Sequence, residues 1–208
     1  MKKNIVSILS PLIIIILGFL TAKVFSTFMY EWTFLPVSLI YWATLLFFTK
    51  RKNINIKDMF NKPRESKNLL IVLLIFSLIP FLNFILNIGL LKNLFIIIIW
   101  LLFSILNPLF EEVYWRGVLL NTLPFRKKWI AIFYSTLLFV LSHKLIWGVF
   151  SIGYNSLLVT LLFAIMGIVW SIIYLKTKSL WYCYLSHVLI DIFSLSVFML
   201  LNLYIPLV

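Results

Sequence analysis

Long apolar segments alternate with short polar ones along the 208 residues of the chain. Each apolar segment is close to the ~20 residues that an α-helix needs to cross the hydrocarbon core of a bilayer. This pattern predicts an all-α, polytopic membrane protein, a helical bundle of about seven transmembrane helices. The expected spans are residues 5–28, 32–48, 69–91, 94–120, 129–143, 155–175 and 180–203.

The basic residues gather in alternate polar segments. With the N-terminus in the cytoplasm, the cytoplasmic segments hold most of the 18 Lys and Arg residues, which obeys the positive-inside rule. The start of the chain also resembles a signal peptide, but we see no small-x-small cleavage site near Ala22 and expect an uncleaved first span. The basic residues assigned to the cytoplasm are Lys2, Lys3, those from Lys50 to Lys67, Arg126, Lys127, Lys128, Lys176 and Lys178.

Composition narrows the class of protein further. Hydrophobic residues make up 63% of the chain and charged residues 12%, which excludes an ordinary soluble domain. The net charge is +12, and the basic residues that carry it lie mostly in the polar segments between the apolar runs, where they orient a membrane protein. We therefore expect no nucleic-acid partner. The lone Cys183 excludes an intrachain disulfide. We see no internal repeat and expect one membrane domain, residues 1–208, in a bacterial cell membrane.

Three of the six acidic residues and both histidines lie inside predicted helices. They are Glu111, Glu112, Asp191, His143 and His187. A charge at bilayer depth costs at least ~2.5–3.5 kcal/mol on insertion scales, so such groups usually face a wet cavity and have a function there. A carboxylate and an imidazole together can move protons at neutral pH. The sequence therefore predicts a membrane-embedded enzyme.

Helical spacing separates the two glutamates. Glu112 and Arg116 are four residues apart with the acid first, the favourable order for an ion pair, and pairing lowers the cost of burying both. Glu111 lies ~100° around the helix and has no such partner, so it is the carboxylate left for catalysis. The alternative is that all three charges form a structural network.

His187 and Asp191 are also four residues apart and share one helix face. The aspartate could orient the imidazole, or both could donate hydrogen bonds if the acid is protonated. The alternative is a buried structural pair in which the two side chains only satisfy each other's hydrogen bonding. Counting from the cytoplasmic helix ends, Glu111, His143, His187 and Asp191 lie at overlapping depths of roughly 11–21 Å. We expect them to surround one cavity that opens more to the cytoplasmic side than to the outside.

Three motifs occur in order on three of the predicted helices: Glu-Glu-x-x-x-Arg at 111–116, Phe-x-x-x-His at 139–143 and His-x-x-x-Asp at 187–191. In this order they resemble the CAAX-protease and bacteriocin-processing (CPBP or Abi) family of intramembrane endopeptidases, long called metalloproteases. The motif-bearing part is about residues 94–203, whereas residues 1–92 are similar only in being hydrophobic and are expected to be accessory.

The resemblance implies a role for each motif residue. Glu111 and His143 would activate a water molecule, and His187 with the residue at 191 would stabilise the oxyanion. The family often has Asn at this last position, and Asp191 cannot donate a hydrogen bond when it is ionised. Asp191 must therefore be protonated, or it orients His187 instead.

The expected reaction is hydrolysis of a peptide bond in a membrane-associated, lipidated or apolar peptide, with the lipid bilayer as the second partner. We expect no cofactor, since no His-Glu-x-x-His helix is present. The alternative is zinc, for which Glu111, His143 and His187 could supply three ligands and leave one open position. Two other functions stay open: bacteriocin self-immunity or another membrane interaction without hydrolysis, and a proton-coupled carrier, although we find no paired halves.

Overall fold

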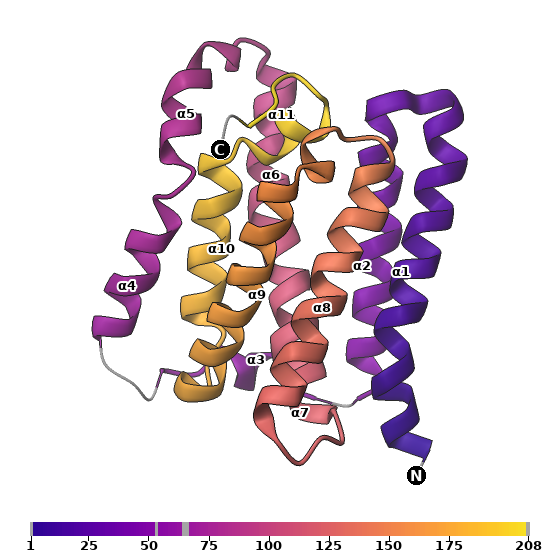
Figure 1. Cartoon of the computed structure of the whole chain (residues 1–208), viewed down its shortest axis with the longest axis vertical. Helices are drawn as coiled ribbons and strands as arrows, with labels where there is room; N and C mark the ends of the chain where they lie inside the picture. The colour runs from indigo at the N-terminus through magenta and orange to yellow at the C-terminus, as the bar shows by residue number, and fades with distance from the viewer. Residues whose placement is uncertain (1, 53, 64–66, 207–208) are drawn as a thin grey trace.

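The computed structural model describes residues 2–52, 54–63 and 67–206. In these ranges every regular element is helical and no strand is present. The longer helices lie side by side in one bundle, with their axes mostly along its long direction (Figure 1). Many large apolar side chains remain exposed on its outside, as the surface facing lipid requires. The predicted all-α membrane bundle is confirmed.

The first two helices form an antiparallel hairpin beside the rest of the bundle. α1 (Lys2–Met29) and α2 (Phe34–Lys50) are joined by a short 3-10 turn, η1 (Tyr30–Thr33). α1 packs against α8 (Lys128–Ile146). Gly18 permits this approach, since a Cβ atom there would lie 2.5 Å from the side chain of Ile146. Small residues at helix contacts serve the same purpose in membrane proteins generally.

The third predicted span is not one continuous helix. It consists of α4 (Lys67–Ser77), α5 (Phe81–Asn87) and the 3-10 turn η2 (Ile88–Leu90). Pro80 lies at the break, and its missing N–H cannot continue the hydrogen bonding of the preceding helix. The polar loop before α4 contains the short helix α3 (Ile56–Met59).

The fourth span changes its hydrogen bonding in the middle. α6 (Leu94–Glu111) runs through Pro108 and continues as a π-helix, η3 (Glu112–Leu119), and then as α7 (Leu120–Thr122). All eight residues of η3 are buried, and this segment contacts α2, α3, α8 and α9 (Leu157–Thr177). Segments of π-helix are rare and frequently occur at functional sites.

The last predicted span is shorter than expected. α10 (Trp181–Phe193) ends early, Leu195 adopts the left-handed conformation, and α11 (Ser196–Leu200) follows. Between α8 and α9 the chain forms two 3-10 turns, η4 (Trp147–Val149) and η5 (Gly153–Asn155).

The expected count of seven spans is not established. Within the described residues, five stretches are long and apolar enough to cross a membrane, and α10 is not among them. The first of these stretches, Ile5–Lys50, contains the α1–α2 hairpin.

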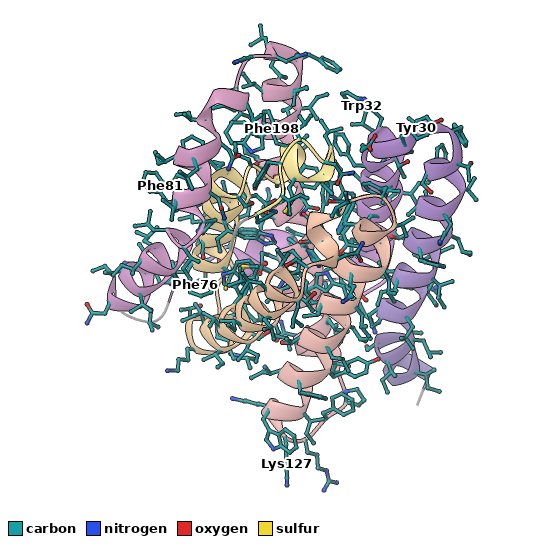
Figure 2. The ribbon with its side chains drawn as sticks, turned by 45° about the horizontal axis from the view of Figure 1, so that its top comes forward. Tyr30, Trp32, Phe76, Phe81, Lys127 and Phe198 are labelled. Atoms are coloured by element: carbon teal, nitrogen blue, oxygen red, sulfur yellow. The ribbon has the colours of Figure 1, made fainter. Side chains whose placement is uncertain are left out.

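The basic segments lie together at one end of the bundle. The beginning of α1, the end of α2, α7 and the end of α9 are all at the lower end in Figure 1. Lys127, in the loop before α8, is at the bottom of Figure 2. This arrangement agrees with the orientation that the positive-inside rule predicts, and we refer to it below as the basic end.

Candidate active site

Glu111 is the meeting point of the three motif helices. Its side chain is fully buried near the end of α6. Its Oε1 atom lies 3.7 Å from Nε2 of His143 on α8, and its Oε2 atom lies 3.6 Å from Nε2 of His187 on α10. Both separations exceed a direct hydrogen bond. The predicted convergence of these three residues is therefore present, with the two imidazoles facing opposite oxygens of one carboxyl group.

The Phe-x-x-x-His motif fixes the ring of His143. Its Nδ1 atom lies 2.9 Å from the carbonyl oxygen of Phe139, one turn earlier on α8. Because a carbonyl can only accept, Nδ1 carries the proton and Nε2 of the neutral ring keeps its lone pair toward Glu111. The rings of Phe139 and Phe163 lie 4.3 and 4.4 Å from the imidazole, centroid to centroid. Backbone and aromatic contacts thus set both the tautomer and the direction of the base.

The Glu-Glu-x-x-x-Arg motif fixes the ring of His187. Glu112 Oε1 accepts hydrogen bonds from Nη1 of Arg116 at 3.0 Å and from Nδ1 of His187 at 2.9 Å. The predicted ion pair is present, and its carboxylate also orients an imidazole on another helix. Trp170 stacks on His187 at 4.3 Å, and the Arg116 guanidinium lies over the ring of Phe139 at 4.4 Å.

Asp191 lies beside His187 but contacts it less closely than the sequence suggests. Its Oδ1 atom is 3.8 Å from Nε2 of His187, and Oδ2 has no hydrogen-bond partner among the described residues. Glu111 and Asp191 therefore both face the same nitrogen, while Glu112 holds the other. The local pair predicted from the four-residue spacing is present at 3.8 Å, and a closer contact between helices holds the other ring nitrogen.

Two side chains at the site were not predicted from the sequence, and both come from α2. The Tyr41 hydroxyl donates to Glu111 Oε1 at 2.8 Å and accepts from Nε1 of Trp115 at 3.1 Å. Trp42 contacts α6 one turn before Glu111. The N-terminal region, which was expected to be accessory, thus contacts Glu111 and Asn107 directly. A Tyr-Trp pair inside an apolar run gave no signal in the sequence that could predict these contacts.

Tyr41→Phe is expected to lower the rate of the reaction that Glu111 carries out by about tenfold. The change removes one hydrogen bond to a carboxylate, worth ~1.5–3 kcal/mol when the acceptor is charged, while the ring keeps its packing. The rate should fall without a comparable loss of thermal stability in detergent. An unchanged rate would show that Tyr41 does not position Glu111.

A cavity of about 110 Å³ adjoins these residues and is lined by Asn107, His143, His187 and Asp191, among others. Its remaining lining comes from the α4–α5 break, the first half of α9 and the C-terminal segment, including Tyr204 and Pro206. These parts lie in the half of the bundle away from the basic end (Figure 1). We expected the cavity to open mainly toward the cytoplasmic side, whereas several of its lining segments lie away from the basic end.

The zinc alternative named Glu111, His143 and His187 as three ligands. In the described ranges, no three His, Cys, Asp or Glu side chains are placed so that they could hold a metal ion. The Nε2 atoms of His143 and His187 lie near different oxygens of Glu111.

Residues 93–193 match the family model described as "Type II CAAX prenyl endopeptidase Rce1-like". The matched stretch runs from the residue before α6 to the end of α10 and includes Glu111, His143, His187 and Asp191. Neither the curated proteins nor the solved structures gave a significant match. The family resemblance seen in the three motifs is confirmed.

Proposed function

We propose that the chain hydrolyses a peptide bond with a water molecule activated by Glu111 and His143, in keeping with the match of residues 93–193 to a CAAX prenyl endopeptidase family model. Its substrate would be a membrane-associated, lipidated or apolar peptide. The observation that carries the proposal is a fully buried carboxylate facing two imidazole nitrogens from different helices. Ionisable groups buried in this way within a membrane usually mark functional sites.

The distances around Glu111 support a bridging water. At 3.7 Å, Glu111 and His143 are too far apart for a direct hydrogen bond, but one water between them can donate a hydrogen to each. The lone pairs of this water are then free to attack a carbonyl in the cavity. Since both neighbours of the water accept hydrogens, either can take the proton that it loses.

The reaction then follows in two steps. The water oxygen bonds to the scissile carbonyl carbon while Glu111 takes one of its protons. Collapse of the tetrahedral intermediate breaks the C–N bond, and the proton from Glu111 passes to the leaving amine. The products are a carboxylic acid and an amine, and the carboxylate is restored. Proton transfer of this kind contributes ~10²–10⁴-fold to a rate.

Oxyanion stabilisation would come from the side of His187 and Asp191. Because Glu112 holds the Nδ1 hydrogen of His187, this ring can donate from Nε2 only as an imidazolium. Asp191 can donate only when it is protonated. Both groups therefore need an added proton before they can stabilise the developing negative charge.

Cleavage by this mechanism is expected to be independent of metal. The native chain would be reconstituted in lipid vesicles with apolar and lipidated peptides, and products would be identified by mass spectrometry with and without a zinc chelator. We expect equal rates in both conditions. Loss of cleavage with the chelator and recovery with added zinc would contradict the mechanism, whereas no cleavage in any condition would contradict the function.

A further inference from the structure

The cavity contains an amide side chain that is not part of the three motifs. Asn107 lies on α6 one turn before Glu111, on the same helix face, and is 4% exposed. Nε1 of Trp42 on α2 donates to Oδ1 of Asn107 at 3.0 Å. Because this contact holds the amide oxygen, the amide nitrogen and its two hydrogens point to the other side of the group.

That other side faces the candidate active site. The Asn107 side chain lines the cavity together with His143, His187 and Asp191. Since Trp42 holds the amide oxygen, the amide nitrogen is the atom that Asn107 can present to this cavity.

We propose that Asn107 donates a hydrogen bond to the oxyanion of the tetrahedral intermediate and that Trp42 positions it. This inference rests on the proposed endopeptidase function. His187 and Asp191 each need an added proton before they can donate, whereas an amide always carries its hydrogens. A donor already held in place stabilises the oxyanion without reorganisation. Trp42 lies outside the matched residues 93–193, so the α1–α2 hairpin completes the catalytic apparatus.

Asn107→Asp tests the donor directly. The substitution keeps the size of the side chain and the oxygen that Trp42 contacts but removes both amide hydrogens. We expect kcat to fall about a hundredfold, the effect of losing one oxyanion donor. KM should change little, because the contact forms only in the transition state.

The double variant N107D/D191N exchanges the positions of the amide and the acid while the total charge stays that of the native chain. We expect kcat to recover at least about tenfold over Asn107→Asp, since the amide introduced at position 191 donates into the same cavity. A purely structural role of Asn107 would not predict this rescue.

Trp42→Phe tests the positioning role in a variant that keeps the fold. The phenyl ring retains the stacking on Phe110, seen at 5.3 Å, but lacks the N–H that holds Asn107. We expect kcat to fall about tenfold with KM and thermal unfolding close to native. The matched control is Trp32→Phe in the η1 turn, which should retain the native rate.

The outcomes separate this inference from the function on which it rests. If the native chain cleaves and Glu111→Gln does not, a rate for Asn107→Asp within about threefold of native overturns the oxyanion role alone. A rate for N107D/D191N no higher than that for Asn107→Asp would also overturn the oxyanion role alone. If the native chain cleaves no peptide, the function and the oxyanion role fail together.

Discussion

Glu111→Gln is expected to reduce peptide cleavage by at least ~10²–10⁴-fold, the contribution of a positioned general base. The neutral amide cannot take a proton from water, although it keeps the shape of the glutamate and an oxygen that Tyr41 can still contact. His143→Ala should cause a similar loss, because the water then lacks its second partner. The measurement is the rate of product formation by the reconstituted chain.

Folding must be compared in the same preparations. Glu111→Gln removes a buried charge and should unfold at a temperature no lower than that of the native chain, since burying an ionised carboxylate is costly. The inactive variant should also retain bound peptide that the native chain releases as products. Cleavage by Glu111→Gln at the native rate would show that Glu111 is not the general base. Bacteriocin protection that survives this substitution would favour binding without hydrolysis.

The parts of the site that depend on local spacing could be predicted from the sequence. Glu112 and Arg116 pair as their four-residue separation indicates, and the Phe139 carbonyl holds the His143 ring one turn later. These contacts follow from the geometry of one helix, which the order of residues specifies. The ordered motifs also pointed to the meeting of three helices.

The contacts between helices could not be predicted in the same way. Tyr41 is 70 residues before Glu111, and nothing in the apolar run around it distinguishes it from residues that pack or face lipid. The second contact of Glu112 could not be predicted either. The four-residue spacing pairs Glu112 with Arg116, but nothing in the sequence indicates its hydrogen bond to His187 on another helix. The hydropathy pattern also predicted continuous helices through Pro80 and Leu195, where the structure has breaks. Hydropathy measures the polarity of side chains and not the geometry of the backbone.

Glu112→Ala is expected to lower the free energy of unfolding by about 3–5 kcal/mol, the cost of breaking a buried ion pair from one side. Arg116 is 1% exposed and would keep its charge without the carboxylate that it now contacts at 3.0 Å. Nδ1 of His187 would lose its acceptor at the same time. Thermal or denaturant unfolding in detergent micelles measures the first effect, and the cleavage rate measures the second.

Replacing both charged residues separates stability from catalysis. The double variant E112M/R116M removes the whole ion pair and fills its volume with apolar side chains, so much of the lost stability should return. Cleavage should remain low, because no carboxylate holds Nδ1 of His187 and its Nε2 atom is no longer directed at Glu111. Recovery of both properties would show that the pair is only a structural network. Recovery of stability alone would assign Glu112 the second task of orienting His187 for the reaction.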